Sequence, residues 1–157
     1  MGVARNRKGE GMRVDGPKQD LTYAIIGCAM HVHNALGPGL KEVHYHRAMS
    51  LEMERGGLSF EHEKCIEMEI DGAFVGLLYL DHLVAGTVIV EEKALPHLLT
   101  QEEVAQVVTY LAATGLRVGV LLNFGRQRLE YRRILPPKKR DEWQARIRRY
   151  VWSPRPP

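Results

Sequence analysis

Apolar residues recur along the chain with two different periods, and the change of period separates helical from extended segments. Between residues 21 and 36 they fall at steps of three and four, which predicts a helix of about sixteen residues with Asp20 as its N-cap. A Gly-Pro-Gly sequence at 37–39 ends this helix. A second helix is expected over residues 40–55, because Gly56-Gly57 stops it.

Three extended segments follow, joined by short turns. Residues 58–70 alternate apolar and charged side chains in their second half, which is typical of a strand with one face in solvent. Asp71-Gly72 is a hairpin turn signal, so residues 73–80 are expected to return as a second strand that ends in Asp81. Ala85-Gly86 then leads into a β-branched strand at 88–93. The simplest assembly is a three-stranded antiparallel meander.

A helix and an unbroken apolar strand come next. Thr100 and Glu103 form a capping-box pattern for a helix over residues 101–114, which Gly115 ends. The apolar strand at 116–124 would then complete a β-α-β crossover and run parallel to residues 88–93. A last strand is expected at 129–135. The fold class is therefore α/β (α+β), a mixed β-sheet flanked by helices.

Charged residues stand at the end of the β-branched strand and carry the candidate chemistry. Glu91 and Lys93 share one face of the strand and Glu92 takes the other, because side chains alternate. Asp81, across the hairpin, can lie beside Glu91. Two carboxylates with a nearby ammonium suit a magnesium site that acts on a phosphodiester. The same pattern also fits a hairpin whose charges simply enter water, and the stretch alone leaves both readings open.

Composition narrows the class of protein without choosing a function. At 157 residues, with 45% apolar and 26% charged residues and a formal charge of +3, the chain is typical of one globular domain. We expect no membrane span, no secretory signal and a cytoplasmic location. Cys28 and Cys65 are interpreted as free buried thiols rather than a disulfide. The paired histidines at 31/33 and 44/46 are two residues apart, a spacing that does not place both on one helix face, so we assign them no metal.

The two ends of the chain differ from its middle. Residues 1–18 are predicted to be a disordered basic tail, followed by a domain at 19–135 and a basic, aromatic tail at 136–157. Cations and aromatic rings together suit nucleic acid, while the other readings are a solubilising tail or an arm that forms a homo-oligomer. The candidate nucleic-acid-binding residues are Lys138, Lys139, Arg140, Arg146, Arg148 and Arg149.

Several linked motifs resemble one family. Residues 39–45 read Gly-x-x-Glu-x-x-Tyr, preceded by His-Asn-Ala-Leu-Gly-Pro at 33–38. Residues 88–94, 110–115 and 119–125 follow in the expected order. Together they resemble the GxxExxY protein family, a compact branch of the PD-(D/E)XK nuclease superfamily, over residues 21–135.

The resemblance implies a restriction-endonuclease-like core and an Mg²⁺- or Mn²⁺-dependent nuclease that cuts DNA, with RNA as a further substrate class. Glu42, Asp81, Glu91 and Lys93 match the catalytic positions. The metal would be bound by Asp81, Glu91 and the backbone carbonyl of Glu92. Gln106 and Tyr110 match a Gln-x-x-x-Tyr helix motif that positions substrate.

Two residues depart from the family pattern. Glu92 and His82 both stand where apolar side chains are usual, and Glu92 would need a partner such as an arginine or a subunit contact. A second hypothesis keeps the fold but not the chemistry. In that reading the domain is a homo-oligomeric assembly or a nucleic-acid-binding module, and Lys93 only neutralises Asp81 and Glu91.

Overall fold

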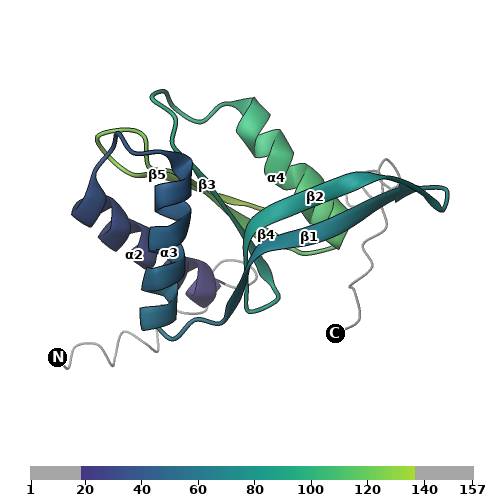
Figure 1. Cartoon of the computed structure of the whole chain (residues 1–157), viewed down its shortest axis with the longest axis horizontal. Helices are drawn as coiled ribbons and strands as arrows, with labels where there is room; N and C mark the ends of the chain where they lie inside the picture. Colours follow the sequence, from purple (N-terminus) through teal and green to yellow (C-terminus); the bar gives the residue numbers. More distant parts are fainter. Residues whose placement is uncertain (1–18, 137–157) are drawn as a thin grey trace.

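The computed structural model describes residues 19–136, which form a mixed β-sheet with helices against both faces (Figure 1). The sheet order is β1-β2-β3-β4-β5, and every neighbouring pair is antiparallel except the parallel pair β3 and β4. The α/β (α+β) prediction is confirmed. The elements are α2 (Gln19–Leu36), α3 (Glu42–Arg55), β1 (Phe60–Ile70), β2 (Ala73–Val84), β3 (Val88–Lys93), α4 (Gln101–Thr114), β4 (Val118–Asn123) and β5 (Glu130–Ile134).

The predicted β-α-β crossover is confirmed and consists of β3, α4 and β4. The side chain of Thr100 accepts a hydrogen bond from the Glu102 amide, and Glu103 completes the capping box at the start of α4. Gly115 ends the helix in the left-handed region at φ 73°. The strands on either side, β3 and β4, pair in parallel from Val88 to Lys93, as expected.

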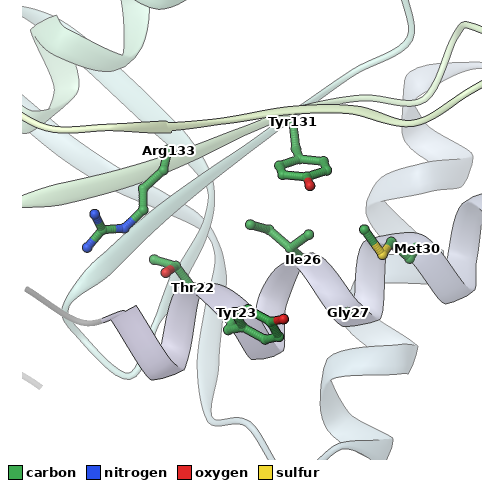
Figure 2. A pocket seen from close by; sticks show the side chains of 7 residues that line it. All are labelled: Thr22, Tyr23, Ile26, Gly27, Met30, Tyr131 and Arg133. Carbon is green, nitrogen blue, oxygen red and sulfur yellow. The ribbon is translucent and has the colours of Figure 1, made fainter. Parts of the chain in front are cut away.

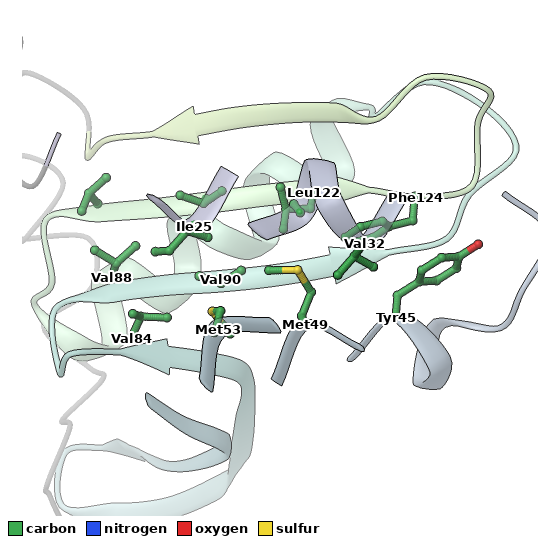
Figure 3. Close-up of a cluster of buried hydrophobic side chains, with 13 residues drawn as sticks. Ile25, Val32, Tyr45, Met49, Met53, Val84, Val88, Val90, Leu122 and Phe124 are labelled. Atoms are coloured by element: carbon green, nitrogen blue, oxygen red, sulfur yellow. The ribbon is translucent and has the colours of Figure 1, made fainter. Parts of the chain in front are cut away.

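Two apolar layers hold the helices to the sheet, one on each face. Val88 and Val90 of β3 point toward α2 and α3, where Figure 3 shows them beside Met49 and Met53. Ile89 points the other way and packs with the α4 residues Val107, Tyr110 and Leu111. Since β3 alternates strictly, the two glutamates that continue it enter opposite layers.

The turn between α2 and α3 depends on the motif tyrosine. The hydroxyl of Tyr45 donates to the Gly37 carbonyl at 2.6 Å and accepts from the Leu40 amide at 3.2 Å. Its ring stacks on Phe124, with centroids 4.8 Å apart. Tyr45 is fully buried. This side chain therefore fixes where α3 begins, and with it the position of Glu42.

The two helix starts differ slightly from the prediction. Asp20 lies inside the first turn of α2 rather than capping it, since the helix already includes Gln19. The second helix begins at Glu42, two residues later than expected, with Lys41 as its N-cap. Glu42 is thus the first helical residue, where its carboxylate can also interact with the helix dipole.

The hairpin of β1 and β2 extends beyond the other strands (Figure 1). Its turn has Asp71 and Gly72 at positive φ, as the Asp-Gly signal predicted. The prediction that β2 ends at Asp81 is wrong, because the strand continues to Val84. Opposite Asp81, Glu63 has φ 54°, and the strand faces change there. Leu80 packs in the α4 layer, whereas His82 contacts α3.

The predicted tail at 1–18 lies outside the described residues, and so does the predicted tail at 136–157 beyond its first residue, with the six basic residues at 138–149. Cys28 and Cys65 are free thiols, both partly buried. Among residues 19–136, no helix has the length and apolar character that crossing a bilayer requires.

Candidate functional site

The site forms where β2 and β3 separate. Their ladder ends at the pair His82 and Val90, so the next pair in register, Asp81 and Glu91, has no main-chain bonds between its members. Side chains replace them. The Asp81 amide donates to Oε1 of Glu91 at 3.1 Å, and the Glu92 amide donates to Oδ2 of Asp81 at 2.9 Å. The predicted proximity of Asp81 and Glu91 is therefore met.

A group of three side chains gathers at this fork. Nε2 of His46 lies 3.3 Å from Oδ2 of Asp81 and 3.5 Å from Oε1 of Glu42. One ligand atom from each residue lies within 4.8 Å of the other two. The His46, Asp81 and Glu42 side chains remain 20, 18 and 44% exposed, so solvent reaches the group. Two carboxylates and an imidazole at this spacing can bind a divalent cation.

The charges of this group are tightly linked. Burial would lower the pKa of His46, but its hydrogen bonds to Asp81 and Glu42 and the nearby carboxylate charges raise that pKa to about 11. Burial would likewise raise the pKa of Asp81, but the hydrogen bonds from His46 and from the Glu92 amide hold it below its ordinary value. The protonated imidazole therefore occupies the position where a cation would be stabilised.

Glu91 faces the α4 side of the sheet. Burial, and then the charge of Asp81, raise the pKa of Glu91 well above its ordinary range. Tyr110 of α4 is affected in turn, since burial followed by the Glu91 charge raises its pKa to about 12. Nε2 of Gln106 donates to the Tyr110 hydroxyl at 2.9 Å. The two members of the predicted Gln-x-x-x-Tyr motif thus act as one pair beside Glu91.

Lys93 lies at the end of β3, on the same face as Glu91. Its charge helps to lower the pKa of Glu103, after the hydrogen bonds from Thr100. Within residues 19–136, no ion pair of Lys93 with Asp81 or Glu91 is formed. The predicted lysine is therefore half-buried at the edge of the site, next to the connection that leads to α4.

A comparison with protein-family models matches residues 19–134 to the PD-(D/E)XK nuclease superfamily. The chain belongs to this superfamily. The match covers the whole sheet and all three described helices, including Asp81, Glu91 and Lys93. A comparison with curated proteins gives no match. The fold is consistent with the restriction-endonuclease-like core of the superfamily, and the domain is nuclease-like.

The candidate cluster of this PD-(D/E)XK domain includes His46, to which the sequence pattern assigns no metal. The spacing of two residues from His44 does not place both rings on one helix face. The informative spacing was the one from Glu42, since residues four apart on a helix lie on the same face. A carboxylate and an imidazole so spaced in the first turns of α3 could have indicated the cluster.

Glu92, on the opposite face of β3, has a buried partner. Nδ1 of His82 lies 2.7 and 3.1 Å from the two carboxylate oxygens of Glu92, and Nε2 of His82 lies 2.7 Å from the Ser50 hydroxyl. Burial lowers the pKa of His82 to about 4 and raises that of Glu92. The prediction that Glu92 needs a partner is confirmed, but the partner is His82 rather than an arginine.

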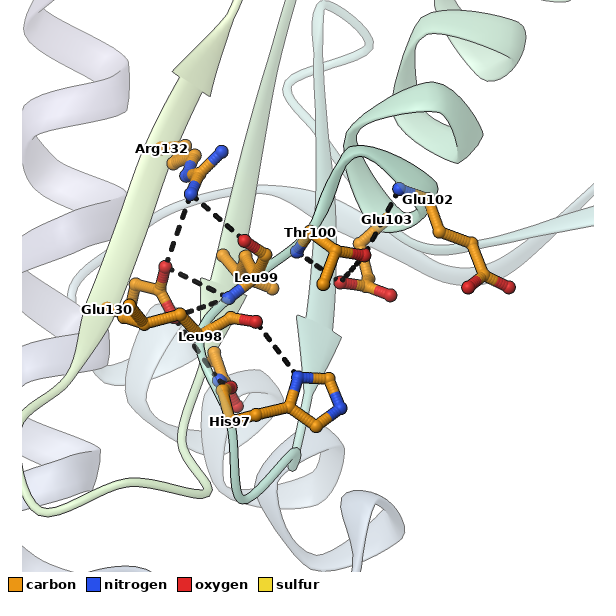
Figure 4. Close-up of polar contacts among 9 residues, drawn as sticks. His97, Leu98, Leu99, Thr100, Glu102, Glu103, Glu130 and Arg132 are labelled. Carbon is orange, nitrogen blue, oxygen red and sulfur yellow. Dashed lines mark hydrogen bonds and ion pairs between the residues drawn. The ribbon is translucent and has the colours of Figure 1, made fainter.

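The connection from Lys93 to α4 is held by the end of β4 and by β5, and Figure 4 shows its contacts with Glu130 and Arg132 of β5. Buried Asn123 accepts hydrogen bonds from the Leu95 and Gly125 amides at 2.9 and 3.1 Å, and donates to the His97 carbonyl at 3.0 Å. Glu130 accepts from the Leu99 amide. A Cβ at Gly125 would lie 2.4 Å from the Leu95 carbonyl oxygen, so only glycine fits. These contacts fix the main chain directly after Lys93.

A hollow of about 400 Å³ lies elsewhere, between α2 and β5 (Figure 2). Its apolar wall includes Ile26 and Met30, and Tyr131 and Arg133 line the β5 side. None of the cluster residues contributes to it. The hollow is therefore separate from the acidic group at the fork.

Proposed function

We propose that the protein is a Mg²⁺- or Mn²⁺-dependent nuclease of the GxxExxY branch that hydrolyses phosphodiester bonds in DNA, with RNA as a second substrate class. The observation that carries the proposal is the group of Glu42, His46 and Asp81, whose ligand atoms lie within 4.8 Å of one another beside Glu91. Superfamily membership supports the same chemistry.

The residues at the fork fit a divalent cation by their chemistry. Asp81 and Glu42 offer carboxylate oxygens, which Mg²⁺ prefers, and the imidazole of His46 adds a nitrogen ligand that Mn²⁺ also accepts. Glu91 and the main-chain carbonyl of Glu92 complete the proposed set. A bound cation supplies an activated water and offsets phosphate charge.

The remaining residues would bind and orient the nucleic acid. Lys93 would place its ammonium against the scissile phosphate or the attacking water. Tyr110 is protonated at neutral pH, and burial and Glu91 raise its pKa further, to about 12, so its hydroxyl can donate to a phosphate oxygen. Gln106 holds that hydroxyl in place.

The test is the substitution Lys93→Ala, assayed on double-stranded and single-stranded DNA and on RNA with Mg²⁺ or Mn²⁺. We expect cleavage to fall about 10²-fold or more, while the far-ultraviolet circular dichroism spectrum stays unchanged. The matched control is Lys64→Ala, since Lys64 lies on β1 and pairs with Glu61. If Lys93→Ala protein cuts as fast as wild type, the assignment of Lys93 is wrong.

One observation favours the alternative of a non-catalytic assembly or nucleic-acid-binding module. His46 already balances Glu42 and Asp81, so the fold needs no cation to neutralise them. The basic residues of the 136–157 segment would then serve nucleic acid or a second subunit. A magnesium titration separates the two, because a cation at 100 times its dissociation constant stabilises the fold by about 2.7 kcal/mol. If magnesium does not stabilise the fold, the result favours the non-catalytic module.

A further inference from the structure

We propose that Ser50, His82 and Glu92 form a positioning network that holds Asp81 and the main chain of Glu92 in place at the fork. The inference deepens the proposed function, since the cation site at the fork rests on it.

The network is connected directly to the cluster at two places. His82 follows Asp81 in β2, and Glu92 uses its own amide to donate to Oδ2 of Asp81 at 2.9 Å. The Glu92 carbonyl oxygen lies 3.4 Å from Nε2 of His46. The His46 and His82 rings meet edge to face, with centroids 6.5 Å apart. A shift of Glu92 would therefore disturb Asp81 and His46 together.

Main-chain hydrogen bonds between β2 and β3 do not hold Asp81 and Glu92 in place. The β2–β3 ladder stops at His82 and Val90, so one residue further along the strands are joined only by hydrogen bonds that involve side chains. At the same place, a hydrogen bond of 3.1 Å between Nδ1 of His82 and Oε2 of Glu92 joins the two strands. On the α3 side, Ser50 anchors the imidazole at 2.7 Å. The network thus joins α3, β2 and β3 at the point where the main-chain pairing of the two strands ends.

Stability alone does not explain why these residues are polar. His82 and Glu92 are both fully buried, and two apolar residues of similar volume can replace such a pair with little loss of stability. A hydrogen-bonded pair gives a defined geometry that apolar packing does not impose. Residues that hold ligand-bearing groups in this way often change metal affinity by about 10- to 100-fold when replaced.

The experiment compares three full-length variants: Glu92→Leu, the double variant His82→Leu/Glu92→Leu, and Glu92→Gln. The single leucine variant should lose stability, because it leaves Nδ1 of the buried His82 imidazole without its hydrogen-bond partner. The double variant should recover the urea midpoint of wild type to a large extent. Glu92→Gln keeps a side chain that can donate to or accept from Nδ1, so it is the conservative control.

Two readouts then separate positioning from packing. Amide hydrogen exchange of Asp81 and Glu92, measured without cation, should speed up about tenfold in the stable double variant and stay slow in Glu92→Gln. Mn²⁺ titration should give a dissociation constant at least about tenfold higher in the double variant. Unchanged exchange at both amides in a stable double variant overturns the inference. If wild type binds no Mn²⁺ or Mg²⁺, the proposed function fails, and the exchange result still decides the network.

Discussion

Asn123→Ala tests whether the end of β4 holds the connection that follows Lys93. The amide of Asn123 makes three hydrogen bonds of 2.9–3.1 Å, to the Leu95 amide, the Gly125 amide and the His97 carbonyl. Asn123 is fully buried, so alanine would leave a space at the centre of these three bonds and no other side-chain amide to replace them. At about 1 kcal/mol for each bond, the substitution should lower the free energy of unfolding by about 3 kcal/mol.

That loss is large for a domain of this size. A natural domain is stable by about 5–15 kcal/mol, and 1 kcal/mol corresponds to about 2–4 °C in Tm at 150–250 residues. We therefore expect Tm to fall by about 6–12 °C. Urea unfolding followed by circular dichroism gives the free energy directly, provided that the slope with urea is unchanged.

The matched control is Asn34→Ala, the same change at an exposed position on α2. It should alter the free energy of unfolding by no more than about 0.5 kcal/mol. A loss of less than about 1 kcal/mol in Asn123→Ala would refute the reasoning, since the three bonds would then contribute no more than solvent does. Asn123→Asp adds a sharper test, because a carboxylate there faces Oε1 of Glu130, 3.4 Å from the present amide nitrogen. The Asn123→Asp variant should regain part of its lost stability as pH falls, because protonation removes the repulsion between the two carboxylates.

Four further results are expected. Cation binding at pH 8 should release about one proton, because His46, whose pKa is raised to about 11, must lose its proton to act as a ligand. Calorimetry in two buffers of different ionisation enthalpy measures this release, and the substitution His46→Gln should abolish it. Without cation, the stabilisation that His46 provides should be complete below pH 6.5 and disappear as pH rises toward 11, because the folded pKa lies above the unfolded one; the urea midpoints of wild type and His46→Gln should converge accordingly. Ala85→Gly should raise the urea midpoint, because Ala85 has φ 51° in the β2–β3 turn, a backbone conformation that glycine adopts without strain. The same change at Ala105, on the exposed face of α4, should lower the free energy of unfolding by about 1 kcal/mol. Tyr110→Phe should weaken DNA binding and leave Mn²⁺ affinity unchanged, since the hydroxyl is proposed to contact phosphate; equal loss of both would contradict that role.

The sequence predicted the fold well where local signals and burial agree. The capping box at Thr100, the left-handed Gly115 and the apolar strand that follows leave little choice for the β3–α4–β4 crossover. The Asp71-Gly72 turn was equally direct. In each case the deciding interactions lie within a few residues along the chain, which is the range that pattern reasoning covers.

The candidate site was predicted only in part, because its contacts join distant segments. Asp81 and Glu91 could be paired from hairpin register alone. His46 could not be assigned to them without knowing that α3 packs beside the fork. The partner of Glu92 was missed for a similar reason, since His82 changes face at the irregularity opposite Glu63, and strict alternation would have placed it elsewhere.

The long hairpin is joined to the rest of the sheet only through its last residues. In β2, pairing with β3 involves His82, Leu83 and Val84 and nothing nearer the Asp71-Gly72 turn. The outer hairpin can therefore gain or lose residues in pairs, which preserves the strand faces, without moving Asp81. Variants with a longer or shorter outer hairpin would keep the fork and change only how far this arm extends from it.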